Sequence, residues 1–163
     1  MSRRSQIVMT EEEIAAYLKG ARTIVLNSIG KDGVPHPAPM WFAIEDGNED
    51  EDDGSIVMTT FTKSQKIRNL QRDPRVSLLL EDGETYTELR GVVFYGRAEL
   101  AQDVDAVVQV LRAISRHSGG GATDALSETE QAGLRAQAAK RTAIRVRPQR
   151  IVSWDHRKLG GVY

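Results

Sequence analysis

The chain of 163 residues carries 22 basic and 23 acidic side chains, and this balance gives no overall positive field that would favour nucleic acid. It contains no cysteine, which excludes disulfides, thiolate nucleophiles and thiolate metal ligands. No apolar run reaches membrane-spanning length and the first residues lack a signal-peptide core, so we expect a cytoplasmic protein with no membrane partner. The length suits one compact domain over residues 1–163.

The first elements along the chain are predicted to be a helix and a strand. Thr10 and Glu13 have the spacing of a capping box, and the apolar residues after Thr10 recur on one face, which predicts a helix over residues 11–19. Residues 22–29 are typical of a strand, and the glycine-bounded residues 30–33 are typical of a turn.

The partner strand over residues 34–44 contains three prolines, Pro35, Pro37 and Pro39. Each proline removes a hydrogen-bond donor from a sheet, so we expect an edge strand or a strongly bent one. An edge leaves backbone groups to which a planar ligand can bond. The acidic residues that follow, 45–54, predict a solvated loop, since they lack the spaced ligands of a calcium loop.

The stretch from residue 55 to 75 is the most informative part of the chain. A predicted strand over 55–61 runs directly into a predicted helix over 63–71. Asp73 is the one acidic residue in this region, which contains five basic residues. The basic residues are Lys63, Lys66, Arg68, Arg72 and Arg75. Hydroxyl side chains at the strand end and free N–H groups at the helix start also suit an anion. The pattern favours a phosphate-bearing cofactor over a helix whose charges are merely solvated, and over nucleic acid.

Two further strands are predicted over residues 75–80 and 86–100, joined by a turn at Asp82 and Gly83. Gly91 and Gly96 lie inside the second strand and predict bulges or bends.

The last part of the chain predicts two helices and a return to strand. The helices are expected over residues 104–116, with Asp103 as N-cap, and over 128–140, with a capping box at its start. Strands are expected over 142–146 and 150–154. About six mostly antiparallel strands with helices between them predict a mainly β (α+β) fold, a closed or split β-barrel with peripheral helices.

The side chains outside the basic stretch predict no catalytic group and no metal site. His36, His117 and His156 are scattered, and neither a Ser/His/Asp order nor a carboxylate pair is evident. If the protein is an enzyme, a cofactor carries the chemistry. The polar tail around Trp154 is expected to dock onto a neighbouring surface.

Five segments together resemble a known family: MTEEEIAAYL, ARTIVLNSIGKDGVPHPAPMWF, TTFTKSQKIRNLQRDPRVSLLLEDG, LRGVVFYGRAEL and SWDHRKL. They resemble the pyridoxamine-phosphate-oxidase-like split β-barrel superfamily. Within it, they are most similar to the flavin/deazaflavin oxidoreductases of the B group, which use the deazaflavin coenzyme F420. The resemblance implies a single split-barrel cofactor-binding domain. It also implies a homodimer with two cofactor sites at the interface.

The resemblance implies roles for particular side chains. Pro39, Met40 and Trp41 would lie along the cofactor ring edge, and Met58, Thr59 and Thr60 would line the ring and its side chain. Lys63, Ser64 and Lys66 would hold the phosphate. Arg68 would serve an acidic tail, and Trp154 and Arg157 would come from the partner subunit.

One departure from the family pattern bears on the cofactor. FMN-dependent oxidases of this superfamily place an Arg and a Lys on the strand equivalent to residues 34–44, and here that strand has no cation. This favours F420 over FMN. The expected function is hydride transfer from reduced F420 to a small conjugated or heteroaromatic acceptor. The alternatives are an FMN-dependent oxidase or reductase of the pyridoxamine-phosphate oxidase type, and a carrier of flavin, deazaflavin or haem without turnover.

Overall fold

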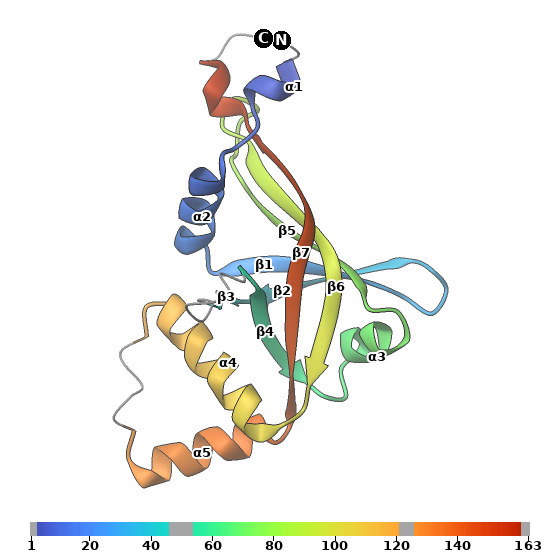
Figure 1. The fold of residues 1–163 in the computed structure, drawn as a ribbon, viewed down its shortest axis with the longest axis vertical. Coiled ribbons are helices and arrows are strands. Elements are labelled where there is room, and N and C mark those ends of the chain that lie inside the picture. The colour runs from blue at the N-terminus through green and yellow to red at the C-terminus, as the bar shows by residue number, and fades with distance from the viewer. Residues whose placement is uncertain (1–2, 46–53, 121–125, 161–163) are drawn as a thin grey trace.

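The computed structural model of the chain describes residues 3–45, 54–120 and 126–160. In these parts of the chain, seven strands form one antiparallel sheet that curls on itself, in the order β2-β1-β5-β6-β7-β4-β3 (Figure 1). The strands are β1 (Thr23–Ile29), β2 (Pro35–Trp41), β3 (Ala43–Ile44), β4 (Ile56–Phe61), β5 (Arg75–Asp82), β6 (Arg90–Ala101) and β7 (Arg141–Asp155). The helices are α1 (Arg3–Gln6), α2 (Glu11–Gly20), α3 (Gln65–Arg72), α4 (Val104–His117), α5 (Glu128–Ala138) and the 3₁₀ turn η2 (His156–Leu159).

The predicted split-barrel fold is confirmed, with seven strands in place of about six. The additional strand arises because the proline-rich run divides at Phe42, whose side chain is fully buried. On one side of Phe42, β2 pairs with β1; on the other side, β3 pairs with β4. The two pieces therefore lie at opposite edges of the sheet order, which confirms the predicted edge and bend.

Local capping signals also predicted the helices correctly. Thr10 and Glu13 form the capping box of α2, and Asp103 accepts a hydrogen bond from the Ala106 N–H at the start of α4. A second capping box, between Ser127 and Glu130, begins α5. The acidic loop predicted at 45–54 lies almost wholly outside the described residues.

Two predicted boundaries are wrong. The strand expected over 86–100 begins only at Arg90, because residues 83–89 form a turn in which the Thr85 hydroxyl donates to Glu88 over 2.9 Å. The two strands expected near the C-terminus are one continuous strand, β7. Opposite Tyr95 and Gly96 of β6, the register shifts by one residue, so that β7 bulges at Gln149 beside Pro148, which has no N–H to donate.

The core has two parts, and β4 separates them. Ile56 and Met58 on one face of β4 belong to the large cluster inside the curled sheet, while Val57 on the other face packs with α4 and α5. Burial of β4 on both faces explains why its sequence is apolar at successive positions. In Figure 1, α4 and α5 lie together at one end of the sheet and η2 lies at the other. No helix of the described chain is long and apolar enough to span a membrane.

Candidate functional site

The most promising cavity, of about 740 Å³, opens where β4 ends, between β2, α4 and the start of β7. A volume of this size is typical of sites for small ligands and cofactors. Strands β2 and β4 supply one wall, and α3, α4, α5 and β7 supply the rest. The lining residues are Pro39, Met40, Trp41, Thr59, Thr60, Phe61, Lys66, Leu111, Ile114, Ser115, Ser118, Gly120, Gln137 and Arg141.

The end of β4 presents two hydroxyl groups to this cavity. Thr60 accepts a hydrogen bond from the Lys66 ammonium over 3.3 Å, and Thr59 accepts one from the Arg141 guanidinium over 3.4 Å. Burial lowers the pKa of Lys66, because desolvation disfavours its charged form. A partly desolvated cation beside a hydroxyl group interacts more strongly with an anion than a fully hydrated lysine does.

The start of α3 adds unsatisfied donors next to Lys66. Ser64 occupies the N-cap position, but its hydroxyl makes no capping bond, and it is buried without a hydrogen-bond partner among the described residues. The first turn of α3 also carries N–H groups without helical partners and the positive end of the helix dipole. A phosphate group fits this set of donors, because it supplies acceptors for both the hydroxyl and the ammonium.

The structure brings six of the predicted site residues together in the β4 cavity: Pro39, Met40, Trp41, Thr59, Thr60 and Lys66. Others lie elsewhere. Lys63 lines an adjacent cavity of about 800 Å³, and Arg68 is exposed on α3 and lines neither cavity. Met58 is fully buried in the main core and lines neither cavity.

The two predicted tail residues lie at the far end of β7 from this cavity. Arg141 begins β7 and Asp155 ends it, and a strand of 15 residues runs about 50 Å along its path. Trp154 packs against Gly91, and Arg157 makes a two-point ion pair with Asp155, at 2.8 and 2.5 Å. Neither side chain lines the β4 cavity of its own chain.

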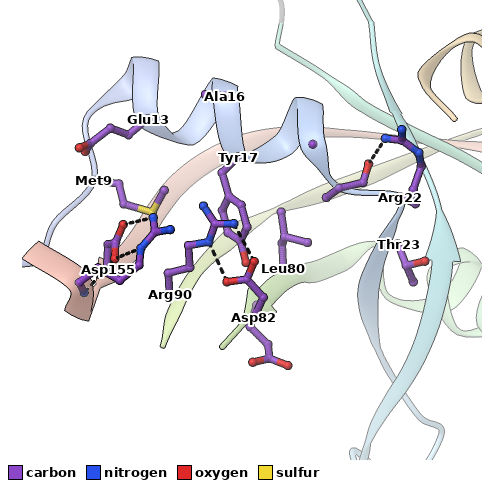
Figure 2. Close-up of a pocket in the computed structure, with 14 residues that line it drawn as sticks. Met9, Glu13, Ala16, Tyr17, Arg22, Thr23, Leu80, Asp82, Arg90 and Asp155 are labelled. Atoms are coloured by element: carbon purple, nitrogen blue, oxygen red, sulfur yellow. Dashed lines mark hydrogen bonds and ion pairs between the residues drawn. The ribbon is translucent and has the colours of Figure 1, made fainter. Parts of the chain in front are cut away.

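A second polar cavity, of about 590 Å³, lies beneath α2 (Figure 2). Arg90 pairs with Asp82 at 2.7 and 2.8 Å, and its guanidinium stacks 4.1 Å above the Tyr17 ring. Burial, together with the Asp82 charge, raises the pKa of the Tyr17 hydroxyl. The Arg157–Asp155 pair lines the same cavity. Since these cations are paired with carboxylates, this cluster joins α2 to the sheet, and the β4 cavity is the better candidate for a ligand site.

Sequence reasoning missed the wall of the β4 cavity that α4, α5 and β7 supply. Arg141 is the clearest example, because it is the register partner of Phe61 across β7 and β4. Its Nε atom is buried without a partner among the described residues, as is the Ser118 hydroxyl at the end of α4. No local pattern signals this wall, since it depends on a strand pairing between segments far apart in the chain.

The sequence model for pyridoxamine 5'-phosphate oxidase matches residues 10–155. The chain therefore belongs to the pyridoxamine 5'-phosphate oxidase family, within a superfamily of split barrels that bind flavin-type cofactors and include oxidoreductases. The comparison with curated proteins gives no match.

Solved structures share the fold over most of the chain. A conserved hypothetical protein from Mycobacterium tuberculosis is 40% identical, with a TM-score of 0.82, and the match covers 100% of this chain and 95% of that one. An F420 reductase is 24% identical with a TM-score of 0.60, over 83% of this chain and 93% of that one. The haem storage protein HutZ from Vibrio cholerae is 19% identical with a TM-score of 0.62, over 88% and 94%. The last two show likeness of fold alone.

Proposed function

We propose that this protein is an F420-dependent oxidoreductase, which transfers a hydride from reduced F420 to a small conjugated or heteroaromatic acceptor. One observation carries the proposal: the partly desolvated Lys66 ammonium, hydrogen-bonded to Thr60, lines a cavity large enough for a ring system. The absence of any cation on β2 supports F420 over FMN, because the FMN-dependent members place phosphate-gripping cations on that strand.

The chain's own residues have separable tasks in this proposal. Lys66, Ser64 and the first turn of α3 would hold the phosphate group. Pro39, Met40 and Trp41 would lie along the ring edge, on a strand at the edge of the sheet. When bound, the deazaflavin ring supplies two-electron hydride chemistry.

The opposite wall of the cavity would orient the acceptor and exclude water. Leu111 and Ile114 of α4 give it an apolar surface, and Ser115, Ser118 and Gln137 add hydrogen-bonding groups. Positioning an acceptor over a ring and shielding it from solvent are the contributions a protein makes when a cofactor carries the chemistry.

A homodimer is part of the proposal, since members of this family are typically dimers. A row of apolar side chains crosses the outer face of the sheet in register: Pro39, Val25, Leu79, Val93 and Val152. Pro39 also lines the β4 cavity, so a second copy on this face would border the site. The tail with Trp154 and Arg157, which lies far from its own cavity, would then contact the cavity of the other subunit.

The proposal is tested by titrating the purified protein with F420 and with FMN and following fluorescence. We expect F420 to bind with micromolar or tighter affinity and FMN to bind more weakly. An FMN affinity tenfold better than that for F420, about 1.4 kcal/mol, would overturn the choice of cofactor. Tight F420 binding without turnover of any nitroaromatic or enone acceptor would instead indicate a carrier.

A further inference from the structure

Arg141 forms the boundary between two cavities. It lines both the β4 cavity and the adjacent one of about 800 Å³, and Phe61 is the other residue that the two linings share. The guanidinium stacks 4.7 Å from the Phe61 ring centre and donates to Thr59 over 3.4 Å, while its Nε atom is buried with no partner in the part of the chain that the structure describes. Stacking fixes the plane of the guanidinium, and Arg141 is among the residues that line both cavities.

The adjacent cavity is strongly cationic. Its lining contains three basic side chains and no carboxylate, and consists of Phe61, Thr62, Lys63, Gln102, Ala139, Lys140 and Arg141. A backbone hydrogen bond from Thr62 to the Lys140 carbonyl, 3.1 Å long, joins the two chain segments that carry these cations. Among the described residues, no acidic side chain forms an ion pair with any of the three.

Three like charges around one cavity repel one another, and a bound anion relieves that repulsion. The composition differs from that of the phosphate-type site at the start of α3, where Lys66 donates to the Thr60 hydroxyl. Here three cations line one cavity, and one of them is an arginine with a planar guanidinium fork. That geometry matches carboxylates, which accept two parallel hydrogen bonds from a guanidinium.

We propose that Arg141, Lys63 and Lys140 form an anion subsite that binds a carboxylate-bearing part of the ligand whose ring occupies the β4 cavity. The identity of that ligand rests on the proposed function, but the subsite itself does not. Lys63 thereby belongs to this subsite and leaves the phosphate to Lys66 and Ser64. The carboxylate has two sources, the acidic tail of the cofactor and a carboxylate on the acceptor.

The subsite is tested first without any cofactor. Citrate, a tricarboxylate, is expected to raise the melting temperature of the wild-type protein by several degrees relative to chloride at equal ionic strength, because it binds the folded state. The shift should fall by at least half in Arg141→Gln. Arg150→Gln is the matched control, since Arg150 also lies on β7 and stacks on an aromatic ring, 4.0 Å from the centre of Tyr95, but lines neither cavity. An equal citrate shift in Arg141→Gln, or none in the wild type, overturns the proposal.

The source of the carboxylate is resolved by a second titration. If the cofactor tail occupies the subsite, Arg141→Gln should weaken F420 at least tenfold and change the affinity for the deazaflavin riboside, which lacks phosphate and tail, less than twofold. If the citrate result holds and F420 affinity is unchanged, the acceptor supplies the carboxylate. If neither F420 nor FMN binds the wild type while the citrate result holds, the subsite stands and the proposed function fails.

Discussion

The indole of Trp154 on β7 lies directly against the backbone of Gly91, its register partner on β6. A Cβ atom at position 91 would come within 2.3 Å of the indole Cζ2. Gly91 therefore leaves room for a ring, and the pairing of β6 with β7 continues past it without a shift of register. The register shift lies next to Gly96, which agrees with the irregularity predicted there, and a Cβ at Gly96 would meet the Arg147 carbonyl at 2.4 Å.

Substitution of Gly91→Ala is expected to lower the free energy of unfolding by about 1–3 kcal/mol, the usual cost of overpacking a closely packed site. The added methyl group must displace the indole or the strand that carries it. Urea denaturation followed by tryptophan fluorescence measures the change.

The matched control for this substitution is Gly133→Ala, because Gly133 lies in α5 with open space around its Cβ position. Alanine in a helix is favoured over glycine by about 1 kcal/mol, so this variant should be as stable as the wild type or slightly more so. The double variant Gly91→Ala with Trp154→Ala should cost less than the sum of the single changes. Additive costs would show that the indole is not the obstacle.

The ion pair between Asp155 and Arg157 should contribute to stability in a pH-dependent way. The Asp155 side chain is only 8% exposed, and hydrogen bonds from Arg157 lower the pKa of its carboxyl group. A lowered folded-state pKa means that this stability is present above the unfolded value, near 4, and is lost as the pH falls through the folded value.

Asp155→Asn is therefore expected to lower the free energy of unfolding at pH 7 by about 1–3 kcal/mol. The difference between variant and wild type should shrink as the pH falls below about 4. Urea titrations at pH 7, 5, 4 and 3 measure it. A difference that is constant over this range would assign the effect to lost packing instead of lost charge.

The same ion pair bears on the predicted role of the tail. Arg157→Ala removes the partner of a buried carboxylate, so a loss of cofactor affinity in that variant is interpretable only beside Asp155→Asn. Trp154→Phe, which keeps a ring against Gly91, separates an effect on packing from an effect on the partner's site.

Signals within one element predicted most of the fold from sequence. The capping residues Thr10 and Ser127 act on N–H groups within three residues, and both were assigned correctly. The continuity of β7 was missed because it depends on the pairing with β6: Pro148 is accommodated where the register between the two strands shifts by one residue. The prolines of β2 were informative because they act on their own strand.

The parts of the candidate site that lie within one continuous segment were also predictable from the sequence. The cluster near Lys66 lies within one continuous segment, so its hydroxyl and ammonium groups are visible in the sequence. Arg141 was not predicted, because only the pairing of β4 with β7 brings it to Phe61, 80 positions earlier in the chain. A single arginine at the start of a strand carries no such information by itself.

Lys66→Met is expected to separate cofactor binding from stability. Loss of a charge-assisted hydrogen bond to phosphate should weaken F420 binding by about 1.5–3 kcal/mol. The free energy of unfolding of the ligand-free protein should be unchanged or higher. Burial that lowers the pKa of Lys66 opposes folding of the charged form, and methionine removes that cost. Fluorescence titration and urea denaturation measure the two quantities.

Arg68→Met provides the comparison on the same helix, since Arg68 is exposed and lines neither cavity. The resemblance gave it a role toward the acidic tail, and the structure places the cationic cavity elsewhere. F420 affinity within twofold of the wild type would agree with that placement. Equal losses in Lys66→Met and Arg68→Met would point to a diffuse field of positive charge instead of a built phosphate site.

The outer face of the sheet should be covered by a second copy of the chain. Val25, Leu79, Val93 and Val152 are register partners across four strands and are half-buried, whereas their neighbours Leu26, Leu78 and Phe94 fill the core on the other face. Light scattering at micromolar concentration is expected to report twice 18.1 kDa for the wild type. Val93→Lys should give a monomer, because a two-fold arrangement would bring the lysines of both copies to one interface.

Val34→Lys is the control for added charge, because Val34 is 58% exposed and lies before β2, outside the row. It should remain dimeric. Since the proposed cofactor site draws on both subunits, monomeric Val93→Lys should also lose F420 affinity, by tenfold or more, while it unfolds with normal cooperativity. A folded monomer that binds F420 as tightly as the wild type would confine the site to one chain and remove Trp154 and Arg157 of the partner subunit from it.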